Sequence, residues 1–186
     1  MKRLSITATP LDGVLRVDRK IGRDMRGSFA RLFCAEELAA VGWIGPIAQV
    51  NHSVTARRAS VRGMHFQYAP HAETKLVTCI RGIVFDVAVD LRKGSPTYLQ
   101  WHGETLIGAE GGAMLIPPGF AHGFQSLSDD VELIYCHSHA YAASAEGGVH
   151  PFDPAIGIDW PEPAGEISDR DQSHPSLTDD FQGVIL

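Results

Sequence analysis

The stretch Val61–Gln67, with the sequence VRGMHFQ, has the pattern of a β-strand with a histidine near its middle. Side chains alternate between the two faces of a strand, so Gly63, His65 and Gln67 are expected on one face and Arg62 on the other. The imidazole on the polar face can accept a proton near neutral pH. A core histidine in an ordinary hairpin is the alternative that these residues alone leave open.

A second apolar run, Lys75–Ile80, begins eight residues after Gln67. We expect the two runs to be adjacent strands that direct His65 and Lys75 into one cavity. Such a pair suits carbanion or enolate chemistry, because a histidine can remove the proton next to a ketone and a lysine can stabilise the enolate oxygen.

The composition is that of one globular domain, which we expect to span residues 1–186. Hydrophobic residues make up 44% and charged residues 20% of the chain, and 19 glycines and 11 prolines favour a turn-rich β fold over a helix bundle. The net charge of −6 argues against a partner such as nucleic acid or a membrane surface. An anionic small ligand would need a local cluster of arginines.

The three cysteines, Cys34, Cys79 and Cys136, are odd in number and widely spaced, which is unlike a disulfide framework. The N-terminal residues lack the apolar core of a signal peptide, and no run approaches the length of a membrane span. We therefore expect reduced thiols and a cytoplasmic location.

Short alternating or apolar runs separated by turn residues recur along the chain. One helix is expected at residues 35–42, where acidic residues come early and a glycine ends the run. The expected strands lie within residues 4–22, 47–53, 84–91, 97–101, 112–116 and 131–136. This pattern predicts an all-β sandwich or barrel of the jelly-roll kind, with few short helices.

Two of these strands carry polar side chains that a purely structural strand does not need. Asp86 lies opposite the apolar face of the strand at residues 84–91, so it is either exposed on an open sheet or paired in a polar cavity. Gln49, Asn51 and Ser53 share one face of the strand before the opening motif. They are either edge residues or ligand contacts.

His65 and His122 are separated by a β-meander, which is the layout of a cupin barrel. A metal-binding cupin would have a second histidine where Gln67 stands, and the amide of Gln67 is a poor ligand for a transition metal. Glu73 is displaced, and Lys75 would bring a cation close to the metal. A metal site made of His65, His122 and Glu73 is therefore disfavoured. The remaining histidines considered as ligands are interpreted as surface residues: His71, His137 and His139.

A series of motifs in a fixed order resembles the dTDP-4-dehydrorhamnose 3,5-epimerase family over nearly the whole chain. The most specific feature is the combination of the His65 and His122 motifs at this separation. The motifs are Asp24–Phe29, Gln49–Ser53, Arg62–Gln67, Lys75–Val77, Val84–Arg92, Gly94–Thr97, Ile116–Phe124 and Gly157–Pro161.

The resemblance implies a metal-free cupin jelly roll that needs no cofactor. It implies epimerisation at C3 and C5 of dTDP-4-keto-6-deoxy-D-glucose to dTDP-4-keto-L-rhamnose, through an enolate. His65 would be the catalytic base, paired with Asp171, and Lys75 would stabilise the enolate. Tyr135 would return a proton on the opposite face of the sugar.

The resemblance also implies a substrate-binding set and a homodimer in which the neighbouring subunit completes the nucleotide site. Asp86 would orient His122 in the pocket, and Tyr141 would stack on the nucleotide base. Arg26, Arg62 and Arg170 would form a positive cluster suited to a diphosphate. The remaining binding positions are Gln49, Asn51, Gln67 and Glu146.

Three positions depart from the family pattern: Arg31 stands in place of a glutamate, Cys136 in place of a lysine and Ala143 in place of a proline. They leave the nucleotide base and the exact sugar open. A 3-epimerase, or another keto-sugar isomerase acting on a different nucleotide sugar, is the alternative, although Tyr135 favours double epimerisation. A metal-dependent cupin oxygenase and a catalytically silent sugar-binding cupin are the rivals from other classes.

Overall fold

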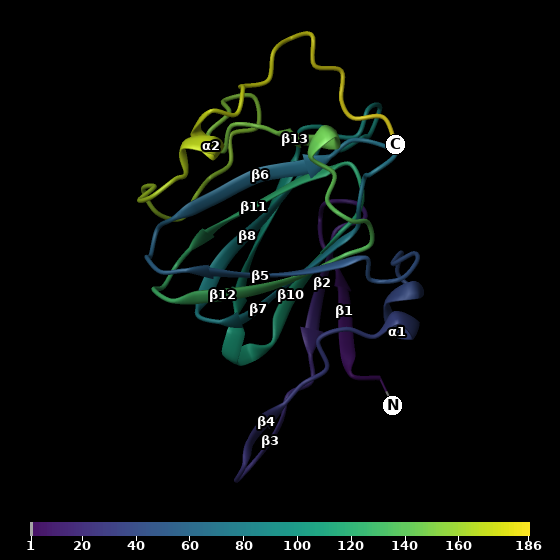
Figure 1. Ribbon diagram of the computed structural model, residues 1–186, viewed down its shortest axis with the longest axis vertical. Coiled ribbons are helices and arrows are strands. Elements are labelled where there is room, and N and C mark those ends of the chain that lie inside the picture. Colours follow the sequence, from purple (N-terminus) through teal and green to yellow (C-terminus); the bar gives the residue numbers. More distant parts are fainter. Residues whose placement is uncertain (1) are drawn as a thin grey trace.

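Two facing antiparallel sheets form the body of the protein in the computed structural model, which describes residues 2–186 (Figure 1). The six-stranded sheet has the order β1 (Leu4–Ala8), β2 (Leu15–Arg19), β10 (Gly112–Ile116), β7 (Lys75–Arg81), β12 (Val131–His137) and β5 (Gln49–Thr55). The five-stranded sheet has the order β13 (Glu146–Gly148), β6 (Val61–Gln67), β11 (Phe120–Ser126), β8 (Ile83–Asp90) and β9 (Trp101–Ile107). The all-β jelly-roll prediction is confirmed.

The remaining elements are short. A hairpin of β3 (Gly22–Asp24) and β4 (Gly27–Phe29) projects away from both sheets (Figure 1). The predicted helix at residues 35–42 is present as α1 (Ala35–Ala39), and it ends before Gly42, which has a φ of +104°. The other short elements are α2 (Asp169–Gln172) and the 3₁₀ turns η1 (Gly108–Glu110) and η2 (Ala143–Ala145). No helix within residues 2–186 combines the length and apolar character needed to cross a membrane.

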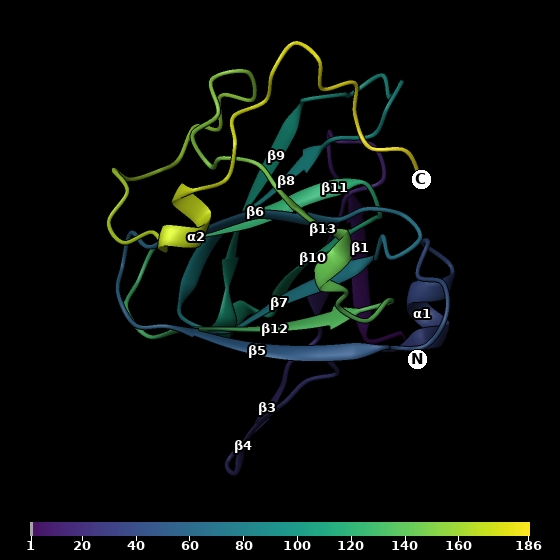
Figure 2. The same ribbon diagram turned by 45° about the horizontal axis from the view of Figure 1, so that its top comes forward.

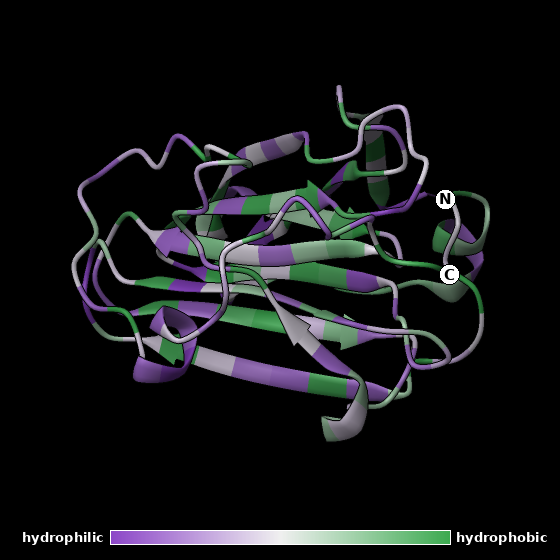
Figure 3. Ribbon diagram, turned by 90° about the horizontal axis from the view of Figure 1, so that it is seen from above, coloured by the Kyte–Doolittle hydropathy of each residue, from purple (hydrophilic) through white to green (hydrophobic). Residues whose placement is uncertain are grey.

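The buried apolar side chains form three clusters. Hydropathy changes from residue to residue along the strands, as Figure 3 shows. Residues from both sheets, such as Leu133 and Phe124, pack between the sheets. The outer face of the five-stranded sheet packs against the C-terminal segment, which contributes Ile156. Leu38 and Trp43 cover the outer face of the six-stranded sheet. Each sheet therefore buries apolar side chains on both of its faces.

Two expectations about the opening motif are wrong. β6 and β7 are not adjacent, because they belong to different sheets and face each other across the interior. The simple alternation also fails, because the β6–β11 pairing shifts register so that Arg62 is opposite Phe124 and His65 is opposite His122. Since residues 122 and 124 share a face, Arg62 and His65 also share one.

Gly63 makes this shift possible. Its φ is +128°, and a Cβ atom at this position would lie 2.6 Å from the Cα of Gly123. Only a glycine allows the two backbones to approach this closely.

The predicted strand at residues 97–101 is also wrong, because this segment is a turn and β9 starts at Trp101. Local hydrogen bonds explain the difference. The hydroxyl groups of Ser95 and Thr97 donate to Oδ2 of Asp90, over 2.5 and 2.6 Å, and Arg92 donates to the same carboxylate. Side-chain bonds of this kind favour turns over strand pairing.

Candidate active site

A cavity of about 380 Å³ lies between the two sheets, within the size range of small-molecule sites. Strands from both sheets supply its walls, and the mouth is formed by the segments around η2 and α2. The residues predicted from sequence that line it are Gln49, Asn51, Arg62, His65, Gln67, Lys75, His122, Tyr135, Tyr141, Glu146 and Arg170. The structure therefore brings together most of the predicted site, from positions far apart in the chain.

His65 is hydrogen-bonded to Asp171, with 2.7 Å between Nε2 and Oδ1. Asp171 lies on α2, which runs beside β6 (Figure 2), and the backbone N–H of Gly63 donates to its Oδ2 over 3.2 Å. Ser168 caps α2 by accepting from the backbone N–H of Asp171. Burial raises the pKa of Asp171, but the bonds from His65, Gly63 and Ser168 outweigh it, so the pKa lies below its usual value.

An ionised Asp171 determines the tautomer of His65. Because a carboxylate can only accept, the proton in this hydrogen bond belongs to Nε2 of His65. The lone pair of the neutral ring is then on Nδ1. The arrangement fits a general base whose orientation and charge are supported by a carboxylate.

His122 forms a second pair, with 2.7 Å between its Nε2 and Oδ1 of Asp86. Asp86 is completely buried, and this burial raises its pKa despite the opposing effects of His122 and Lys75. Its other oxygen, Oδ2, has no hydrogen-bond partner among the described residues. Of the two readings left open by the sequence, the paired one holds, because Asp86 is buried and bonded to His122, which lines the cavity.

The Lys75 side chain is buried and held at two points. Its Nζ donates to the backbone carbonyl of His65 over 3.0 Å and lies 3.1 Å from Oε1 of Glu73. Glu73 also accepts from Nε2 of Gln67, over 3.0 Å. Glu73 was predicted only as a displaced metal ligand, and its role as the partner of Lys75 was missed. Its position two residues before Lys75 was the only signal.

Tyr135 enters the cavity from β12, in the sheet opposite His65. Its hydroxyl is 3.3 Å from Oγ of Ser53, and burial raises its pKa well above the usual value, although the bond with Ser53 opposes this. The phenol is therefore neutral at physiological pH and can donate a proton.

His137 stacks on Tyr135 with 6.2 Å between ring centroids, so its interpretation as a surface histidine is wrong. Burial and the charge of Lys75 lower the pKa of His137 to about 4, although Glu73 opposes the shift.

Polar contacts at the mouth hold the predicted nucleotide-binding residues. The hydroxyl of Tyr141 donates to Oε2 of Glu146 over 3.0 Å, and Arg170 pairs with Oε1 of the same carboxylate. Oε1 of Gln49 accepts from the backbone N–H of Tyr141 over 2.9 Å. Gln67 is bound to protein groups on both ends of its amide, since its Oε1 also accepts from the backbone N–H of residue 142.

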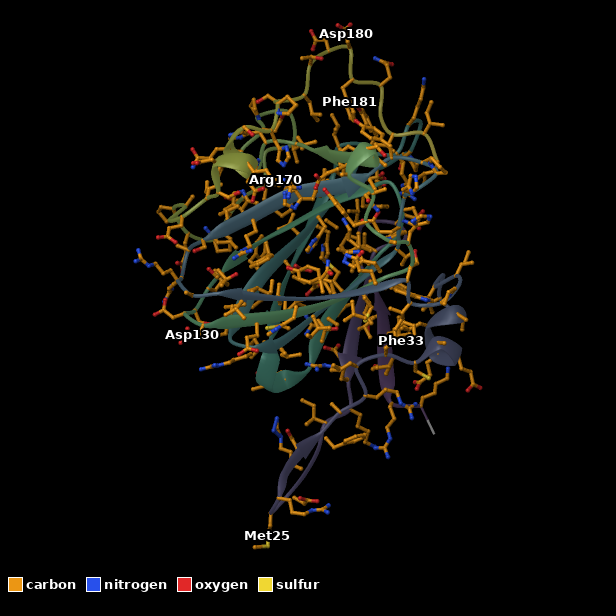
Figure 4. The ribbon with its side chains drawn as sticks, in the orientation of Figure 1. Met25, Phe33, Asp130, Arg170, Asp180 and Phe181 are labelled. Atoms are coloured by element: carbon orange, nitrogen blue, oxygen red, sulfur yellow. The ribbon has the colours of Figure 1, made fainter. Side chains whose placement is uncertain are left out.

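Arg26 is the predicted binding residue that lies far from this cavity. It belongs to the projecting hairpin and pairs with Asp24, with 2.7 Å between Nη2 and Oδ2. Figure 4 shows Met25 at the tip of this hairpin, at the opposite end of the molecule from Arg170. The positive cluster of three arginines is thus not assembled within one chain, which contributes only Arg62 and Arg170.

His174 was not identified from the sequence. Its ring lies edge-on to His65, with 5.3 Å between centroids, and its Nε2 is 3.8 Å from Oδ1 of Asp171. The place of this histidine, three residues after Asp171, was a weak sequence signal for His174.

The metal alternative considered from the sequence consists of His65, His122 and Glu73. These residues are not assembled as a cluster within residues 2–186.

Together, the jelly roll and its proton-transfer residues define a cupin-type epimerase. The sequence model of the dTDP-4-dehydrorhamnose 3,5-epimerase family matches residues 8–179. The chain belongs to this family.

Individual relatives agree with this assignment. The dTDP-4-dehydrorhamnose 3,5-epimerase of Sinorhizobium fredii is 43% identical over 86% of this chain and 82% of its own length. The dTDP-4-dehydrorhamnose 3-epimerase of Streptomyces niveus is 42% identical over 87% of this chain and 78% of its own. A solved structure of the dTDP-6-deoxy-D-glucose-3,5-epimerase of Legionella pneumophila, in complex with dTDP-4-keto-L-rhamnose, has a TM-score of 0.87 and 36% identity, covering 92% of this chain and 91% of that chain.

Proposed function

We propose that the protein epimerises C3 and C5 of dTDP-4-keto-6-deoxy-D-glucose and so forms dTDP-4-keto-L-rhamnose. The observation that carries the proposal is the arrangement of His65 and Tyr135, which enter one cavity from opposite sheets. A sugar ring between them would have a base on one face and an acid on the other. This arrangement suits inversion at a carbon whose proton is removed on one side and returned on the other.

The reaction proceeds by proton transfer next to the C4 ketone. Nδ1 of His65 accepts the proton from the carbon, and the electron pair moves into an enolate whose oxygen the Lys75 cation stabilises. Tyr135 then donates a proton to the opposite face of the same carbon. Afterwards His65 loses its proton to solvent, and solvent reprotonates the Tyr135 phenolate. Because the same ketone acidifies C3 and C5, the steps can repeat at the second carbon, and no cofactor is required.

The supporting residues have roles that follow from their contacts. Asp171 orients His65 and stabilises its protonated form, while Asp86 holds His122 at the sugar end of the cavity. At the mouth, arginines bind the diphosphate and an aromatic ring stacks on the base. The proposed substrate-binding set is Gln49, Asn51, Arg62, Gln67, His122, Tyr141, Glu146 and Arg170.

Arg26 enters the proposal through a second subunit. The hairpin that carries it exposes the large apolar side chains of Met25 and Phe29, which would be covered in a homodimer. In this arrangement each chain, as one cupin-type domain over residues 1–186, lends Arg26 to its neighbour's nucleotide site. The three free cysteines suit a reducing compartment, and we place the enzyme in the cytoplasm.

The reaction is tested with dTDP-4-keto-6-deoxy-D-glucose in heavy water. We expect deuterium at both C3 and C5, and His65→Ala should abolish the incorporation. In Tyr135→Phe, incorporation should survive better than net formation of the L-sugar, because only the opposite-face proton donor is lost. Equal loss of both would argue against this role of Tyr135, and no label at either carbon would reject the substrate.

A 3-epimerase is the second candidate, since a relative 42% identical to this chain bears that name. The same experiment separates the two activities, because a 3-epimerase would incorporate deuterium at C3 alone. Tyr135, with its Ser53 partner, can return a proton at either carbon, so the position of the label decides between the two activities.

The shared nucleotide site is tested by mixing Arg26→Ala and His65→Ala chains after separate purification. In a mixed dimer, one cavity would combine an intact His65 with the partner's intact arginine. We therefore expect activity to return on subunit exchange. If mixing restores no activity although mixed dimers form, Arg26 does not act across the interface.

A further inference from the structure

A group of potential metal ligands includes the proposed base and its carboxylate partner. His65 comes from β6, Asp171 from α2, and His174 from the turn after α2. One ring nitrogen of each histidine and one carboxylate oxygen of Asp171 all lie within 4.8 Å of one another. The proton-transfer mechanism uses the first two residues and leaves His174 unexplained.

The His174 ring is held in place although its Nε2 forms no hydrogen bond. This atom is buried and has no partner among the described residues. The ring packs on Gly148 of β13, where a Cβ atom would lie 2.2 Å from the ring carbon Cε1. Nε2 of His174 lies 3.8 Å from Oδ1 of Asp171, so a metal ion between the two groups would give it a partner.

We propose that His65, Asp171 and His174 form an inhibitory binding site for a divalent transition metal of the zinc type. Two imidazoles and one carboxylate form a donor set suited to zinc, and Mg²⁺ or Ca²⁺ would prefer oxygen ligands. Zinc binds these atoms at about 2.0 to 2.2 Å, which places the ligands of a tetrahedral site roughly 3.4 Å apart. The 2.7 Å contact between His65 and Asp171 would open and the 3.8 Å contact between His174 and Asp171 would close. Water from the cavity would be the fourth ligand.

The inhibition follows from the tautomer of His65, and this part rests on the proposed function. Metal at Nε2 uses the lone pair of that nitrogen, so the single N–H proton of the neutral ring moves to Nδ1. Nδ1 then has no lone pair and cannot accept the proton from C3 or C5. Since the metal lies on the side of the ring facing Asp171, the nucleotide sugar would still bind. Zinc should therefore lower kcat and leave KM unchanged.

Binding is tested by calorimetry with Zn²⁺ and by the visible absorption of Co²⁺, which needs no enzymatic activity. Wild type should bind one ion, and His174→Gln should weaken binding at least about tenfold. Gly148→Ala should also weaken binding, because it displaces the His174 ring and removes no ligand. His139→Gln is the control, since His139 pairs edge-on with His71 elsewhere on the protein.

The outcomes separate this site from adventitious binding. Absence of Zn²⁺ and Co²⁺ binding to folded wild type would overturn the site, and so would binding weakened by His139→Gln but not by His174→Gln. The inhibition is measured as the rate of deuterium incorporation with Zn²⁺, relative to each variant's own metal-free rate, and chelation should reverse it. One bound ion without inhibition would overturn the inhibitory role. Binding to a protein inactive on the sugar would reject the proposed function and retain the site.

Discussion

The two histidine–carboxylate pairs have the same hydrogen-bond length and different surroundings. Each has 2.7 Å between Nε2 and a carboxylate oxygen. Asp171 accepts a further backbone hydrogen bond and has a lowered pKa, whereas Asp86 is completely buried, has one unpaired oxygen and has a raised pKa. The comparison shows that a short contact alone does not define a catalytic base. The surroundings of the supporting carboxylate matter as well, because the bonds that lower the pKa of Asp171 favour the ionised form, which stabilises a protonated imidazole.

The largest difference is expected when each histidine is replaced by asparagine. His65→Asn should lower the rate of deuterium incorporation by about a thousand- to ten-thousandfold, because the base is lost. His122→Asn should lower it by only about ten- to a hundredfold, because the loss affects stabilisation and orientation. Quenched-flow or steady-state incorporation, followed by mass spectrometry, measures both. Equal losses would show that the two pairs share the base function.

Replacing the two carboxylates should lower kcat less than replacing the histidines, and the loss should again be larger for the pair that contains His65. Asp171→Asn should reduce kcat by about a hundredfold and leave KM nearly unchanged, because His65 loses its tautomer control. Asp86→Asn should reduce kcat by about tenfold or less, since Asp86 supports His122 and does not contact the proposed base. Steady-state kinetics with the sugar substrate checks this order. A larger loss for Asp86→Asn would reverse the assignment of the two pairs.

The smallest effect is on stability, where the two carboxylates should act with opposite signs. The lowered pKa of Asp171 contributes stability above the unfolded pKa of about 4, and this is lost as the pH falls through the folded value. The raised pKa of Asp86 contributes stability that is present below that pH and lost as the pH rises through the folded value.

Urea unfolding of wild type and the two asparagine variants measures these contributions across pH. The stability deficit of Asp171→Asn should grow with pH from about 3 to 5, whereas Asp86→Asn should become more stable relative to wild type as the pH rises above about 4. If the free energies of unfolding of the two variants changed with pH in the same way, the opposite pKa shifts of Asp171 and Asp86 would be contradicted.

Much of the fold could be predicted because the strands have clear periodicity. The strand at residues 84–91 was recognised from its alternation, and Asp86 was placed on the face opposite Val87. The errors arose where local geometry breaks the period. At Gly63 the register shifts and brings Arg62 to the face of His65, and at residues 97–101 hydrogen bonds to Asp90 replace the expected strand.

The site was harder to predict because its contacts connect distant positions. Asp171 is 106 residues from His65, and no spacing rule connects them, so its expected role came from family resemblance. His174 was missed and the role of Ser53 stayed open, because their significance depends on what lies beneath the ring or across the cavity.

The sequence by itself determined the strand faces where the alternation is unbroken, the turn-rich β class and the side chains capable of the chemistry, because these depend on residue type and local periodicity. Only the tertiary structure decided that His65 and Lys75 face each other from different sheets and that Asp171 is the ionised partner. Sheet assignment depends on pairing between distant strands, and the charge of a buried carboxylate depends on its full set of neighbours. Neither property is encoded in the spacing of residues along the chain.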